Sequence, residues 1–170
     1  MTIRTERQAD YDAVYQVVET AFKTAEQSDG NEQDLVNALR QSSAFIPELS
    51  LVSEIDGKIV GHIMFTKLQI GEHTALALAP LSVLPQYQNQ GIGTSLIMEG
   101  HKIARELGYS YSVVLGSETF YPQAGYLPAE TFGIKPCFEV PSENFMAYQL
   151  CENAPIISGV VKYAEEFGIA

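Results

Sequence analysis

Two glycines at the predicted start of a long helix are the residues of this sequence best placed to bind an anion. Gly91 and Gly93 lie just after an apolar run, in the segment Gln88-Asn89-Gln90-Gly91-Ile92-Gly93-Thr94. Glycine lets the backbone approach a ligand closely, and the first N–H groups of a helix have no partner within the helix. With the positive end of the helix dipole, these amides can hold a phosphate group. Because such a site needs no cationic side chain, it also functions in a chain of formal charge −11.

The spacing around these glycines separates three kinds of phosphate site. A nucleotide P-loop requires a Lys after its last glycine, whereas Thr94 follows Gly93. A dinucleotide-binding fingerprint requires a third small residue where this sequence has Leu96. That fingerprint also belongs to a parallel sheet, but Asp56-Gly57 lies between two β-rich runs and predicts an antiparallel hairpin. The remaining pattern is Q-x-x-G-x-G, and a nucleotide-binding protein stays a rival hypothesis.

The elements that would position this loop follow from the hydrophobic periodicity. Apolar residues recur at helical spacing over 8–22, 35–39 and 91–107, and β-rich runs cover 51–55, 58–67, 74–83, 111–115 and 145–150. The helix at 91–107 joins two strands, which predicts a crossover between parallel strands. We therefore expect one α+β domain with a mixed, mostly antiparallel sheet of about six or seven strands and helices on both faces.

Pro80 interrupts the most apolar run of the sequence, TALALAPLSV over residues 74–83. Such a run is typical of a central strand that is covered on both faces. Proline cannot donate to the hydrogen-bond ladder and is confined to sheet edges and bulges. The sequence therefore predicts that this strand bulges at Pro80 or parts there from its neighbour.

The composition narrows the choice of partner and location. Lys and Arg number 10 against 21 Asp and Glu, and no stretch is basic enough to attract a nucleic acid or an anionic membrane. The acidity favours cationic partners such as amines, although solubility alone also accounts for it. No run approaches the ~18 apolar residues of a membrane span, and the N-terminus lacks a signal-peptide core. Cys137 and Cys151 form no metal or redox motif, so we expect a reduced, cytoplasmic protein without a metal.

The Q-x-x-G-x-G pattern at Gln88, Gly91 and Gly93 resembles the pyrophosphate-binding motif of the GNAT acetyltransferases, which use acetyl-CoA. Residues 120–126, FYPQAGY, resemble the later Y-x-x-x-G-F/Y signature of that family. Further segments are similar to one bacterial branch of predicted N-acetyltransferases, at residues 32–40, 61–65, 78–83, 138–141 and 145–146. The resemblance covers roughly residues 3–150. It implies a GNAT domain over residues 1–150, with an extension over residues 151–170 packed on the same domain.

The resemblance also implies roles for particular residues. In GNAT proteins the pantetheine arm lies in a gap beside the bulged fourth strand, so the backbones of Leu81 and Val83 would pair with its amides. One of their N–H groups would polarise the thioester carbonyl. GNAT proteins often have an Asn and a longer helix where this chain has the short loop 116–119, which makes Ser117 the candidate contact there. The expected acetyl-CoA contacts are Leu81, Ser82, Val83, Gln88, Asn89, Gln90, Gly91, Ile92, Gly93, Thr94 and Ser117.

Tyr121 matches the tyrosine that in many GNAT enzymes protonates the departing CoA thiolate, and it is our candidate catalytic residue. A purely structural role in an aromatic cluster with Phe120 and Tyr126 is the alternative. The general base stays open among Glu32, Glu54, His62 and Glu118. We expect His73 in an exposed turn and His101 on the solvent face of its helix.

The expected reaction is transfer of an acetyl group to a primary amine by direct attack. The sequence offers no Cys or Ser nucleophile that is paired with a base. The amine could belong to a small molecule or to a protein. A non-catalytic module that only binds acyl-CoA is the alternative. The last twenty residues could cover the site or form a homodimer contact.

Overall fold

The computed structural model describes residues 1–23 and 30–169. Its α-helices are α1 (Tyr11–Phe22), α2 (Glu32–Arg40) and α3 (Ile92–Glu106). Its strands are β1 (Thr2–Thr5), β2 (Phe45–Ile55), β3 (Lys58–Ile70), β4 (His73–Val83), β5 (Tyr111–Leu115), β6 (Leu127–Pro128), β7 (Ile134–Lys135), β8 (Phe145–Gln149) and β9 (Gly159–Lys162). Short 3-10 helices join them: η1 (Gln8–Asp10), η2 (Pro85–Tyr87), η3 (Tyr121–Ala124), η4 (Ala129–Phe132), η5 (Ser142–Asn144) and η6 (Glu165–Phe167).

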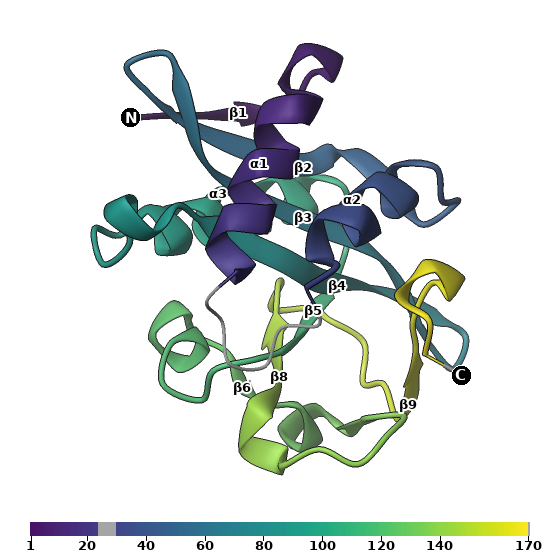
Figure 1. Ribbon diagram of the computed structural model, residues 1–170. Coiled ribbons are helices and arrows are strands. Elements are labelled where there is room, and N and C mark those ends of the chain that lie inside the picture. The colour runs from purple at the N-terminus through teal and green to yellow at the C-terminus, as the bar shows by residue number, and fades with distance from the viewer. Residues whose placement is uncertain (24–29, 170) are drawn as a thin grey trace.

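The main sheet has the strand order β1-β2-β3-β4-β5-β8-β6 (Figure 1). Its neighbours are antiparallel except for β4 and β5, which are joined through α3 and run parallel. β9 extends the sheet beside the end of β3 and also pairs in parallel with β7. The expected α+β fold, with a mixed and mostly antiparallel sheet, is thus confirmed.

Helices cover both faces of the sheet, as the alternation along β3 shows. A Cβ atom at Gly61 would lie 3.2 Å from Leu96 of α3, whereas the next residue, His62, turns to the opposite face and approaches Glu6. On that opposite face Glu6 also pairs with Arg40 of α2. Neighbouring residues of a strand point to opposite faces, so α3 lies on one side of the sheet and α2 on the other. Figure 1 shows α1 and α2 together in front of the central strands and α3 behind them.

The structure extends the sequence prediction in two places. The strand that was expected from Leu51 begins at Phe45, with a register shift against β3 before Ser50. The C-terminal residues 151–170, which have no clear periodicity, supply β9. In the described part of the chain, no helix combines the length and apolar composition that a bilayer crossing requires.

Candidate functional site

A gap between β4 and β5 opens the sheet at its centre. The two strands pair only at Leu76 with Ser112 and at Ala77 with Val113, although β4 continues to Val83. On its other side, β4 carries an extra residue opposite β3: Ile63 pairs with Leu81 and Phe65 with Leu78. The three-residue step from Leu78 to Leu81 contains Pro80 and faces a two-residue step on β3. The predicted bulge and the predicted parting of the strands are both confirmed.

The N-terminus of α3 faces this gap with unpaired backbone amides. Gly91 is the N-cap residue in a left-handed conformation with φ of 83°, and the first helical hydrogen bond runs from the Ser95 amide to the Gly91 carbonyl at 3.0 Å. The amides of Ile92, Gly93 and Thr94 therefore precede the helical ladder. A Cβ atom at Gly91 would meet no atom within 4 Å, and Gly91 to Thr94 line an open cleft. Open space and unpaired donors at a helix N-terminus fit a phosphate group.

A cleft of about 1380 Å³ runs from the helix α3 N-terminus along the gap. Ten residues that we expected at the site line it together: Leu81, Val83, Gln88, Asn89, Gly91, Ile92, Gly93, Thr94, Ser117 and Tyr121. Two others do not. The Ser82 hydroxyl is buried without a hydrogen-bond partner, and the Gln90 side chain donates to the Gln86 carbonyl at 3.3 Å.

Tyr121 begins η3 and lies half-buried against the floor of the cleft. Its ring meets Phe120 and Tyr126 edge-on, with centroid separations of 5.0 and 5.8 Å. A Cβ atom at Gly116 would lie only 2.5 Å from the Tyr121 ring, so this position must lack a side chain for the ring to sit there. Burial raises the pKa of Tyr121 to about 12. The phenol is therefore protonated at neutral pH, which a proton donor requires.

Asn144 fixes the loop that joins β5 to η3. Gly116 and Asn144 exchange hydrogen bonds: the Gly116 amide donates to the Asn144 carbonyl at 2.9 Å, and the Asn144 side chain donates to the Gly116 carbonyl at 3.0 Å. The same side-chain amide donates to the Glu118 carboxylate at 2.7 Å. The Ser117 hydroxyl oxygen accepts the amides of Thr119 and Phe120, so it forms part of the turn as well as of the lining.

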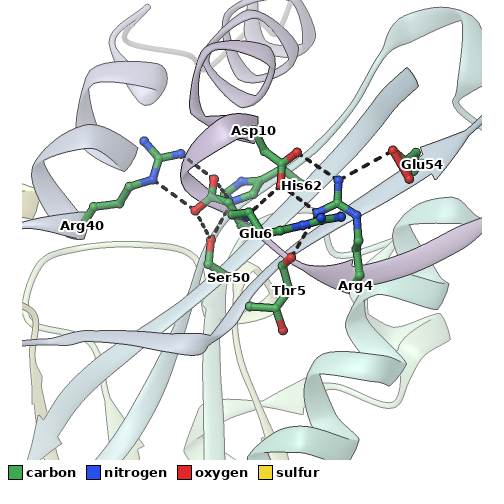
Figure 2. A network of polar contacts seen from close by, with 9 residues as sticks. Arg4, Thr5, Glu6, Asp10, Arg40, Ser50, Glu54 and His62 are labelled. Carbon is green, nitrogen blue, oxygen red and sulfur yellow. Dashed lines mark hydrogen bonds and ion pairs between the residues drawn. The ribbon is translucent and has the colours of Figure 1, made fainter. Parts of the chain in front are cut away.

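The structure separates the four candidate general bases. Glu32 and Glu118 line the cleft. The other two candidates do not line it and belong to a polar network in which Glu54 lies 3.6 Å from Arg4 (Figure 2), although His62 on β3 is paired with Ser82 of β4. His62 is fully buried there, 3.0 Å from the Ser50 hydroxyl and 3.8 Å from Glu6 (Figure 2). Burial lowers the pKa of His62 to about 4, so its ring is neutral at pH 7.

The prediction for His101 is wrong. His101 lies inside α3 with an exposed fraction of 3% and contacts the sheet. Its ring stacks on Tyr148 at 4.2 Å, and its Nε2 atom lies 2.9 Å from the Tyr126 hydroxyl, which is also 2.8 Å from the Ser112 hydroxyl. Burial, assisted by the charge of Arg105, lowers the pKa of His101 to about 4. His73 is exposed where β4 begins, after the turn at Gly71 and Glu72.

Comparison with known families shows the family to which this chain belongs. Residues 11–126, more than half of the chain, match the model of the Acetyltransferase (GNAT) family. The chain belongs to the GNAT acetyltransferase family. Among the described residues, no group of three or more His, Cys, Asp or Glu is placed to hold a metal ion.

Two curated GNAT relatives come from Escherichia coli. The uncharacterized N-acetyltransferase YjhQ is 34% identical over 142 residues, which is 79% of this chain and 78% of YjhQ. The uncharacterized N-acetyltransferase YhbS is 27% identical over 170 residues, which is 98% of each chain. The resemblance therefore extends beyond the shared motif to most of both sequences.

Two solved GNAT structures superpose over nearly the whole chain. The crystal structure of Escherichia coli YhbS in complex with CoA has a TM-score of 0.89 at 26% identity, and covers 99% of this chain and 92% of its own. A GNAT family acetyltransferase from Brucella melitensis in complex with acetyl-CoA has a TM-score of 0.81 at 34% identity, and covers 98% of this chain and 97% of its own.

Several lining residues had no predicted role. They come from the end of α1, the start of α2 and the loop around η5, and include Phe22, Leu35, Val140, Pro141 and Asn144. They belong to three separate segments of the chain, and only the tertiary fold brings these segments to the gap. The one sequence signal that could have pointed to Val140 and Pro141 is the resemblance of residues 138–141 to a branch of the family.

Proposed function

We propose that this enzyme transfers the acetyl group of acetyl-CoA to a primary amine. The observation that carries the proposal is the junction of two features in one cleft: the unpaired amides at the N-terminus of α3 and the unpaired edge of β4 after Ala77. The amides from Asn89 to Thr94 suit the pyrophosphate, whereas the Gln88 amide donates to the Pro85 carbonyl at 3.3 Å. The β4 backbone at Leu81 and Val83 suits the pantetheine amides. The CoA and acetyl-CoA complexes of the two structural relatives support the same ligand.

The lining of the cleft supports direct attack by the amine. Neither Cys137 nor Cys151 lines it, and the Ser117 hydroxyl is engaged in its own turn. In the described part of the cleft we find no nucleophile that is paired with a base. The neutral amine nitrogen would form a bond to the thioester carbonyl carbon and lose a proton to solvent, and the carbon–sulfur bond would then break to release the CoA thiolate.

Tyr121 would supply the proton that the thiolate needs, a role supported by its place in the lining of the cleft. A phenol whose pKa is about 12 is a weak acid beside a thiol of pKa ~8.5, so transfer between isolated groups would be uphill. The apolar surroundings that raise the pKa of the phenol also disfavour the charged thiolate and so raise the pKa of the CoA thiol. The difference between the two pKa values is therefore smaller in the cleft than between the isolated groups. Solvent then returns a proton to Tyr121.

A panel of primary amines, assayed for release of free CoA thiol from acetyl-CoA, tests the proposal. We expect thiol release that depends on both substrates and a product with one acetyl group on nitrogen. The alternative, a non-catalytic acyl-CoA-binding module, is favoured if calorimetry detects acetyl-CoA binding while no amine in the panel releases thiol. Failure to bind CoA at all would contradict both.

A further inference from the structure

The charged side chains in the described lining of the cleft are carboxylates. Of the described residues that line the cleft, the charged ones are Glu32 and Glu118, and none is Lys, Arg or His. At the N-terminus of α3, a phosphate group would be bound by backbone amides and not by cationic side chains. An acceptor that carried a carboxylate would therefore find no charged partner in this lining, whereas a cationic acceptor would find one in Glu118.

Glu118 is held in place and held ionised. The Asn144 side-chain amide donates to one of its carboxylate oxygens at 2.7 Å, and Asn144 itself is tied to Gly116 by two further hydrogen bonds. Its own backbone amide and the Asn144 side chain hold the pKa of the Glu118 carboxyl below its usual range. A carboxylate that resists protonation is a poor base towards an ammonium group, and it is well suited to bind a cation that stays charged.

The reacting amine must lose its proton before it can attack. An ion pair with Glu118 would keep that amine protonated, so the cation at Glu118 has to be a second, non-reacting one. The lining of the same cleft includes apolar side chains at Phe22, Leu35, Val140 and Pro141. Such a surface accommodates a chain of methylene groups that separates two charged ends.

We infer that the acceptor is an alkyl diamine or a longer polyamine, in which Glu118 binds the second ammonium group while the first amine is acetylated. The inference rests on the proposed acetyl transfer and adds the acceptor class to it. Glu118 is an acceptor-binding residue here, so its loss changes KM for the amine more than kcat.

Three acceptors of equal chain length test the inference: 1,4-diaminobutane, butylamine and 4-aminobutanoate. They differ only in whether the far end is cationic, neutral or anionic. Because Glu118 is exposed to solvent, we expect kcat/KM for the diamine to exceed that for butylamine by about fivefold, beyond the statistical factor for two equivalent amines. We expect 4-aminobutanoate to be about fivefold worse than butylamine. Added salt reduces both differences.

The variant Glu118→Gln keeps an oxygen that Asn144 can bind, so the loop retains its anchor. We expect it to abolish the discrimination among the three acceptors, through KM for the amine, without changing KM for acetyl-CoA. Glu130→Gln is the matched control, since Glu130 is exposed on η4 and does not line the cleft. Unchanged discrimination in Glu118→Gln, or a preference of the wild type for 4-aminobutanoate, overturns the inference.

Binding measurements with the same three acceptors test the inference even if no acetyl transfer is detected. If none of the three acceptors releases thiol, calorimetric titration into the CoA-saturated protein replaces the kinetics, and equal affinity for all three overturns the inference. Absence of any CoA binding contradicts the proposed acetyl transfer instead, and titration of the same amines into the protein alone still reports whether Glu118 binds the second cation.

Discussion

The position of the Tyr121 ring is set by a neighbouring glycine and by contacts with two other aromatic rings. Gly116 leaves room for one face of the Tyr121 ring, and Phe120 and Tyr126 hold it edge-on. Tyr126 is in turn fixed by hydrogen bonds to His101 and Ser112. The phenol is thus held by packing, while no side chain in the described part of the protein binds its hydroxyl, which leaves that hydroxyl available to a ligand.

We expect Tyr121→Phe to lower kcat by about 10²-fold and to leave KM for acetyl-CoA nearly unchanged, because it removes a proton donor and keeps the ring. Steady-state thiol-release kinetics measure both quantities. Since the pKa of Tyr121 is about 12, the wild-type rate should show no loss from Tyr121 ionisation up to about pH 10. Tyr163→Phe is the control, since Tyr163 packs on Phe167 and does not line the cleft. Equal kcat values for wild type and Tyr121→Phe would leave Tyr121 with a structural role only.

Helix α3 begins and ends next to left-handed glycines, and only one end faces the cleft. Gly91 precedes the helix with φ of 83°, and Gly108 follows it with φ of 91°. A Cβ atom at either position would meet no atom within 4 Å, but both backbones are strained for any residue that has one. A substitution at either position therefore strains the backbone by a similar amount, but only Gly91 lines the cleft.

This pair gives a matched test of the anion site. We expect Gly91→Val and Gly108→Val to destabilise the fold by a similar amount, about 1–2 kcal/mol each, measured by denaturant unfolding. We expect only Gly91→Val to abolish CoA binding in calorimetry, because its side chain occupies the space before the amides of Ile92 to Thr94. If Gly91→Val binds CoA with wild-type affinity, the N-terminus of α3 is not the pyrophosphate site.

At the scale of the whole molecule, two buried neutral histidines make stability depend on pH. Burial lowers the pKa of His62 and of His101 from 6.5 to about 4. Between these pH values the unfolded chain binds protons that the folded chain does not, so the free energy of unfolding falls as the pH decreases from 6.5 to 4. Each histidine contributes at most about 3 kcal/mol to this loss.

We expect His101→Phe to remove about half of that loss, because a phenyl ring can replace the imidazole against Tyr148 and does not titrate. Urea unfolding at a series of pH values measures the effect. Asp10 provides an internal control: its hydrogen bond with Arg4 lowers the pKa of its carboxyl from 3.8 to about 2, so its contribution is lost only below that window. An identical pH dependence in wild type and His101→Phe would show that His101 binds protons equally in the folded and unfolded states, which contradicts a lowered pKa.

The sequence predicts well what is local and misses what depends on distant partners. The bulge at Pro80 and the glycine N-cap of α3 could be predicted from local chemistry. Proline cannot donate to the strand ladder, and glycine adopts a left-handed conformation without steric cost. The burial of His101 was missed although the residue lies four positions after Ile97 and three before Ala104, on the buried face of α3. Its contacts with Tyr126 and Tyr148 depend on distant segments and could not be predicted. Asn144 likewise acquires its role through Gly116, 28 residues away in the sequence.

The C-terminal residues 151–170 are expected to be an integral part of the domain. Ile157 and Val161 are buried in a cluster with Ile70 and Ile134, and β9 pairs with β3 and β7. Burying one such side chain contributes about 1.5–3 kcal/mol, so deletion of the segment should remove a large share of a typical total stability of about 5–15 kcal/mol.

Adjacent valines of β9 test this without truncating the chain. Val161 is 2% exposed and Val160 is 51% exposed, in the same strand. We expect Val161→Ala to lower the free energy of unfolding by about 1–3 kcal/mol, because it leaves a cavity between β3 and β7, and Val160→Ala to change it by less than about 0.5 kcal/mol. Urea unfolding measures both. If the two variants unfold alike while deletion of residues 151–170 leaves the midpoint unchanged, the segment is a peripheral extension. If Val161→Ala alone is destabilised, the buried face of β9, which pairs with β3 and β7, contributes to the stability of the domain.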